Sequence, residues 1–89
     1  MLKRFIVERE MPGIGEMSMD ELCAAAEHSN EVLAQLAPKV QWSHSYLGGD
    51  HAFCIYVAES EDLVRRHAEI SGFPANRIVE VPRMIDPTT

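Results

Sequence analysis

The chain has 89 residues, of which 46% are hydrophobic and 25% charged, and 14 acidic against 8 basic residues give it a formal net charge of −6. This length fits one domain over residues 1–89, and the acidic balance argues against a nucleic-acid backbone or an anionic membrane surface as partner. Two cysteines, Cys23 and Cys54, are too few for a disulfide framework, and no apolar run is long enough for a signal peptide or a membrane span. We therefore expect a cytoplasmic protein with free thiols.

The first part of the chain predicts a strand followed by a helix. Residues 2–9 alternate between inward and outward positions, with Phe5 and Val7 sharing one face, and this pattern indicates a strand. Ser18 stands three residues before a glutamate, which is the spacing of a capping box, so a helix is expected to begin there. Pro38 ends it, because proline cannot continue the hydrogen-bond ladder.

The rest of the chain predicts a hairpin, a second helix and a last strand. Residues 40–47 and 52–58 read as strands joined by a glycine turn at 48–50. Ser60 caps the second helix, and residues 77–81 form the final strand. The order β-α-β-β-α-β predicts a ferredoxin-like α+β fold, with a four-stranded antiparallel sheet and two helices on one face.

The other face of this sheet is expected to be open and to carry chemistry-bearing side chains. Trp42, Tyr46 and Tyr56 would form an exposed aromatic patch on it, and such patches usually mark an interaction surface. We therefore predict a homodimer in which two open faces stack, as in a dimeric α/β barrel. The positions assigned to this face by alternation are Glu8, His44, Tyr46, Cys54, Tyr56 and Glu80.

Three of these residues suggest a metal site. Glu8, His44 and Cys54 would project from the same face, and imidazole, carboxylate and thiolate together suit a transition metal. No C-x-x-C or H-x-x-x-H spacing accompanies them. Each also has a structural interpretation: an ion pair on the strand for Glu8, a buried apolar role for Cys54 and an interface contact for His44.

His67 falls on the apolar stripe of the second helix, between two aliphatic residues. This position is typical of a hydrogen-bonded core histidine, and a side chain that faces the helix-covered side is separated from an open-face site within one subunit. Metal ligation and a core role both remain open for it.

Several short motifs resemble a small bacterial family of domains of unknown function that includes a nickel-responsive, nickel-binding protein. They span nearly the whole chain in a fixed order. The resemblance implies a ferredoxin-like subunit, a homodimer and metal binding with nickel preferred, and it carries over Glu8, Cys54 and His67 as recurring polar positions. The motifs are Val7-Glu8-Arg9, Pro12-Gly13, Val40-x-Trp42-x-x-Ser45-Tyr46, Cys54-x-Tyr56-x-Ala58, Val64-Arg65-x-His67-Ala68, Gly72-Phe73-Pro74-Ala75-x-x-Ile78 and Ile85-Asp86-Pro87.

We accordingly predict a nickel-binding homodimer for metal sequestration or response, with Glu8, His44, Cys54 and His67 as its metal ligands. One alternative is a small-molecule-binding or catalytic dimeric α/β barrel protein, monooxygenase- or isomerase-like, that uses the open-face cleft. In that case His44 with Glu8 would be an acid–base pair, or Cys54 beside His44 an activated thiol, although no nucleophile motif accompanies them. Another alternative is a purely structural interaction module.

Overall fold

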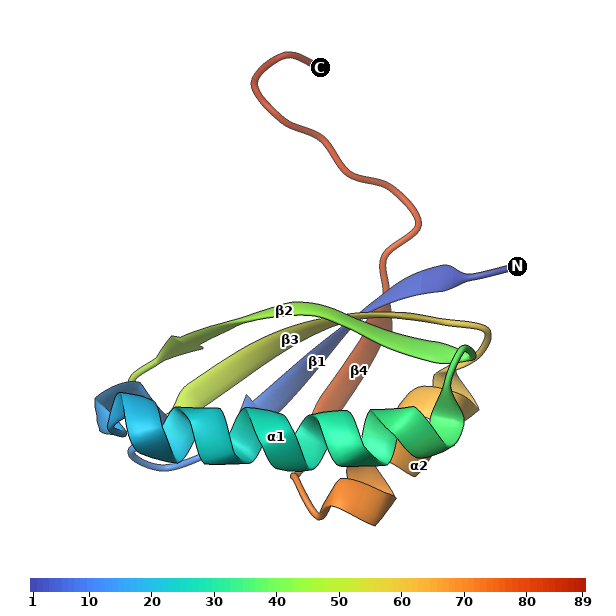
Figure 1. Cartoon of the computed structure of the whole chain (residues 1–89). Helices are drawn as coiled ribbons and strands as arrows, with labels where there is room; N and C mark the ends of the chain where they lie inside the picture. The colour runs from blue at the N-terminus through green and yellow to red at the C-terminus, as the bar shows by residue number, and fades with distance from the viewer.

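The computed structural model describes residues 1–89, and its elements follow the predicted order. The four strands pair antiparallel in the order β2-β3-β1-β4, and both α-helices lie on one side of the sheet (Figure 1). This is the predicted ferredoxin-like α+β fold. Neither helix has the length and apolar character needed to cross a membrane. The elements are β1 (Lys3–Glu10), the 3-10 turn η1 (Ile14–Glu16), α1 (Met19–Leu36), β2 (Val40–Gly48), β3 (His51–Ala58), α2 (Glu61–Ser71) and β4 (Arg77–Glu80).

The helix ends match the sequence signals. The Ser18 hydroxyl accepts a hydrogen bond from the backbone N–H of Glu21 at 3.2 Å, and the Glu21 carboxylate accepts one from the Ser18 backbone at 3.3 Å. This reciprocal pair satisfies two N–H groups that the first turn leaves free. At the start of α2, the Ser60 hydroxyl accepts a hydrogen bond from the backbone N–H of Leu63 at 3.4 Å, without a reciprocal partner. Gly72 ends this helix at φ 79°, a conformation that glycine adopts without a Cβ clash.

The core lies between the helices and the sheet, and the pairing of β1 with β3 decides which residues enter it. Phe5 and Val7 are 1% and 0% exposed, and they stand opposite Tyr56 and Cys54. Directly opposed side chains lie on the same face of a sheet, so Tyr56 and Cys54 are buried under the helices. The prediction that Cys54 and Tyr56 face the open side is therefore wrong. β3 is apolar on both faces, and its alternation alone does not say which face is covered.

An irregularity in β2 changes the faces of its side chains partway along. The register shifts between Trp42 and His44, so that Ser43 is an extra residue without a partner in β3. A bulge of this kind interrupts the two-residue alternation. Trp42 therefore shares the covered face with its partner Tyr56, whereas His44 and Tyr46 face the open side. The prediction that Trp42 belongs to an open-face patch is wrong for this reason.

The open face carries an apolar patch of a different composition, which we call the open patch. Tyr46, Phe53 and Val79 in it are 62%, 39% and 36% exposed. Glu80, predicted for this face, stands opposite the buried Phe5 and so lies on the covered side. The open patch consists of Ile6, Tyr46, Phe53, Ile55 and Val79.

The chain beyond β4 leaves the body of the domain. Residues 82–89 extend away from it on the side of the open face (Figure 1). Met84 and Ile85 in this tail are 75% and 79% exposed, so the tail adds little to the core.

Candidate functional site

The predicted metal ligands are divided between the two faces of the sheet. Glu8 and His44 lie on the open face, whereas Cys54 and His67 are 7% and 0% exposed on the covered face. The expectation that Glu8, His44 and Cys54 share one patch is therefore wrong, because the register of β3 turns Cys54 inward. Within one chain, no three or more His, Cys, Asp or Glu side chains gather closely enough to hold a metal ion.

His44 is accessible on the open face, and both its ring nitrogens contact hydroxyl groups. Nδ1 lies 2.8 Å from the hydroxyl oxygen of Ser43, and Nε2 lies 3.1 Å from that of Tyr46. The His44 and Tyr46 rings meet edge to face with centroids 5.1 Å apart. Since hydroxyls donate as well as accept, either nitrogen is free to be the unprotonated one that a metal needs.

The open face also holds His51, which was not among the predicted metal ligands. His51 is the first residue of β3 and stands directly opposite Glu10 of β1, while its ring stacks on Phe53 with centroids 6.2 Å apart. Opposed residues have Cβ atoms about 5 Å apart, so an imidazole and a carboxylate are neighbours here. His51 stands two residues before Phe53, so strand alternation puts both side chains on one face, and the pairing with β1 makes it the open face.

On the covered face, Arg9 is a buried cation without a carboxylate partner. Its side chain is 2% exposed and donates hydrogen bonds to the carbonyl oxygen of Pro74 and, at 3.2 Å, to the hydroxyl of Tyr56. Its guanidinium carbon lies 5.9 Å from the centre of the Phe73 ring. The ion pairs of the chain involve other arginines, both on α2. A buried charge that has only neutral partners is costly, and it requires an explanation.

Arg9 and burial together determine the protonation of the neighbouring groups. Burial, and after it the charge of Arg9, lowers the pKa of His67 from 6.5 to about 4, so its imidazole is neutral at physiological pH. Burial also raises the pKa of Tyr56 above 10.0, against the opposing effect of Arg9, so the phenol keeps its proton. His67 contacts the hydroxyl of Ser29 through Nε2 at 3.2 Å, and its Nδ1 is buried without a partner.

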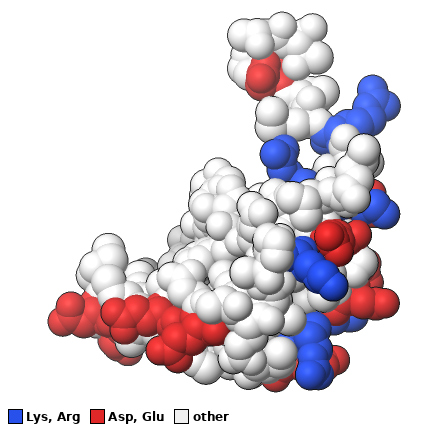
Figure 2. All heavy atoms as spheres, turned by 45° about the vertical axis from the view of Figure 1, so that its right-hand side comes forward, with Lys and Arg blue, Asp and Glu red and all other residues white.

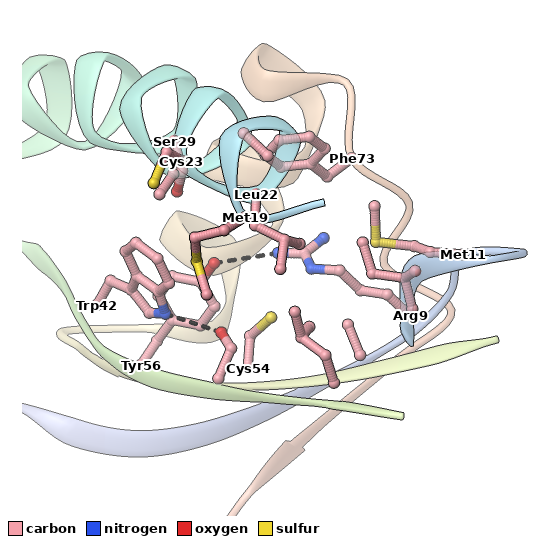
Figure 3. Close-up of a pocket in the computed structure, with 16 residues that line it drawn as sticks. Arg9, Met11, Met19, Leu22, Cys23, Ser29, Trp42, Cys54, Tyr56 and Phe73 are labelled. Carbon is pink, nitrogen blue, oxygen red and sulfur yellow. Dashed lines mark hydrogen bonds between the residues drawn. The ribbon is translucent and has the colours of Figure 1, made fainter. Parts of the chain in front are cut away.

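A pocket of about 320 Å³ opens between the first half of α1 and the covered face of the sheet. Most of the residues that line it are hydrophobic, among them Met11, Leu22, Trp42 and Phe73. The guanidinium of Arg9 projects into its middle (Figure 3). No motif or spacing in the sequence indicates this pocket.

Comparison with known proteins identifies related chains. The family model described as "Nickel responsive protein SCO4226-like" matches residues 5–81. The crystal structure of SCO4226 from Streptomyces coelicolor A3(2) is similar in fold, with a TM-score of 0.76 and 21% sequence identity, over 92% of this chain and 99% of that one. None of the curated proteins compared with the chain matches it.

Proposed function

Because the chain belongs to the nickel-responsive SCO4226-like family, we propose that it binds Ni²⁺ for sequestration or metal response and does so as a homodimer. The family match over residues 5–81 is the observation that carries this proposal. The open face of the sheet is the surface we assign to both the dimer contact and the metal, and the arrangement of its side chains supports each assignment.

The open patch supports dimerisation. It presents aliphatic and aromatic side chains from all four strands, including the exposed Tyr46, Phe53 and Val79. A four-stranded sheet with one uncovered apolar face gains from covering it, because a domain of this size buries only a modest core. A second copy of the chain can cover the open patch, since twofold pairing places the same surface of each copy against that of the other.

The donors on the open face fit nickel once a second copy is present. His44 and His51 supply imidazole and Glu8 and Glu10 supply carboxylate, and both ligand types suit Ni²⁺. One chain does not gather three of them. Twofold pairing of the open faces doubles the number of donors available at the contact. Cys54 and His67 take no part in this proposal, because both are buried on the other face.

Calorimetric titration with Ni²⁺ tests the metal proposal. We expect the parent protein, free of any affinity tag, to bind Ni²⁺, and the double variant His44→Ala/His51→Ala to bind at least about tenfold more weakly, since two ligands are lost. His28→Ala is the matched control, because His28 lies on α1 at the opposite side of the sheet and should leave binding unchanged. Absence of binding by the parent, or equal binding by the double variant, would refute the proposal.

Sedimentation equilibrium tests the dimer. Phe53→Glu places a carboxylate in the middle of the open patch, and desolvating it in both copies costs several kcal/mol, so we expect association to weaken by at least about 100-fold. Met19→Glu is the control, because Met19 is also an exposed apolar residue, at 73%, but it lies on α1. A monomeric parent at tens of micromolar, or equal association constants for both variants, would argue against pairing through this face.

A further inference from the structure

We propose that the pocket between α1 and the sheet binds a small organic carboxylate with an apolar body, and that Arg9 is the residue that pairs with its carboxylate. The pocket lies on the covered side of the sheet, opposite the surface assigned to nickel and to dimerisation. The proposal is therefore independent of the proposed function, and it assigns a second site to the molecule.

Arg9 is buried without an opposite charge and has N–H donors that make no hydrogen bond. A guanidinium has five N–H donors, and here two neutral acceptors, Pro74 and Tyr56, each take one hydrogen bond. Burial without an opposite charge costs several kcal/mol, and an anion that forms a bidentate pair repays it. In Figure 3 the guanidinium reaches inward from β1 and lies in the cavity between α1 and the strands. The unused donors are thus next to space that a ligand would fill.

The other residues that line the pocket indicate the chemistry and size of the part of the ligand beyond its carboxylate. Leu22 and Met19 of α1, Trp42 of β2 and Phe73 surround the space beside Arg9 (Figure 3). Such walls favour an aliphatic or aromatic body. The volume of about 320 Å³ is near the lower end of the ~300–1,000 Å³ typical of ligand pockets, so the ligand is small. Access lies between the start of α1 and β2, where Met19 and Leu47 are 73% and 41% exposed.

The surrounding charges favour a monoanion. Arg9 is the only Lys or Arg residue that lines the pocket, and His67 near it is neutral at physiological pH. Acidic side chains gather at the lower left of the molecule in Figure 2, on the side where α1 lies, and Asp20 and Glu21 stand in the first turn of that helix. A phosphate ester or a polyanion would meet repulsion there with one cation to offset it. A single carboxylate matches the planar fork of one arginine.

Octanoate is a suitable probe, with octanol and octylamine as neutral and cationic counterparts of the same length. We expect calorimetry to detect octanoate binding to the parent, and the indole N–H signal of Trp42 to shift in ¹H–¹⁵N spectra, while octanol and octylamine bind at least about tenfold more weakly. Octanol binding as tightly as octanoate, or no binding of octanoate, would overturn the proposal.

Two variants test separately the charge of Arg9 and the volume of the pocket. Arg9→Met keeps an apolar filler of similar length and removes the cation, and we expect octanoate to bind about 10- to 100-fold more weakly. Arg66→Met is its matched control, because Arg66 is exposed on α2, and it should bind as the parent does. Ala26→Leu fills the pocket from α1 while keeping Arg9, so it should also weaken binding at least about tenfold. If Arg9→Met does not fold, octanoate binding to Ala26→Leu is the test of the proposal. If either folded variant binds octanoate as tightly as the parent does, the proposal is contradicted.

Discussion

The stability of the protein is expected to fall by about 3 kcal/mol as the pH drops from roughly 6.5 to 4, through the titration of His67 alone. Its pKa is about 4 in the folded protein and 6.5 when it is solvated. Over that interval the unfolded chain binds a proton at this residue and the folded chain does not, so acid favours unfolding. Well above pH 6.5 the imidazole is neutral in both states, and its contribution no longer changes.

Urea unfolding at a series of pH values measures this effect against two variants. His67→Gln keeps a polar side chain near Ser29, and His67→Leu does not, but both remove the titration. Between pH 6.5 and 4, we expect the free energy of unfolding of both variants to decrease less than that of the parent. This should hold even where their stabilities at neutral pH differ. A slope that is the same in all three proteins would show that His67 does not titrate in this way.

Gly15→Ala is expected to lower the free energy of unfolding by about 3 kcal/mol, because the loop after β1 packs directly on the β2–β3 hairpin. A Cβ built on Gly15 would lie 2.5 Å from the backbone nitrogen of Gly49 and 3.1 Å from its carbonyl oxygen. The Gly15 N–H also donates to that carbonyl at 2.9 Å. Since these neighbours are backbone atoms, no side chain can move aside, and the loop has to separate from the hairpin.

Gly48→Ala is the matched control in the same hairpin, since a Cβ at Gly48 meets nothing within 4 Å. We expect it to change the free energy of unfolding by less than about 1 kcal/mol. Chemical denaturation of the parent and both variants gives the comparison. Equal stability of the two alanine variants would mean that the contact between the loop and the hairpin is not tight.

The sequence was sufficient to predict the order of elements, because each boundary has a local cause. Ser18, Pro38 and Ser60 are cap or stop residues whose effect depends on their immediate neighbours. The inward face of β1 was also predictable, since Phe5 and Val7 share one face while the charged Arg4 and Glu8 fall on the other. The same alternation continues to Arg9 and shows that its side chain points into the core, which is the signal by which the buried cation could have been found.

The faces of β2 and β3 depend on tertiary structure and were not predictable in the same way. β3 offers an apolar face on either side, and only its pairing with β1 determines that Cys54 is covered. In β2, the extra residue Ser43 separates Trp42 from His44, and the residue type at that position does not predict a bulge. The pairing of β3 separated Cys54 from the ligands on the open face, and the bulge separated Trp42 from the predicted aromatic patch. Neither feature is a property of a single segment.

The direction in which residues 82–89 leave the domain affects how recombinant protein should be prepared. The chain end emerges beside the uncovered side of the sheet (Figure 1). A polyhistidine fusion at Thr89 would therefore hang beside the surface where both self-association and nickel are to be measured, and would add imidazoles of its own. A cleavable fusion, removed before any measurement, avoids an artefact that would imitate the expected result.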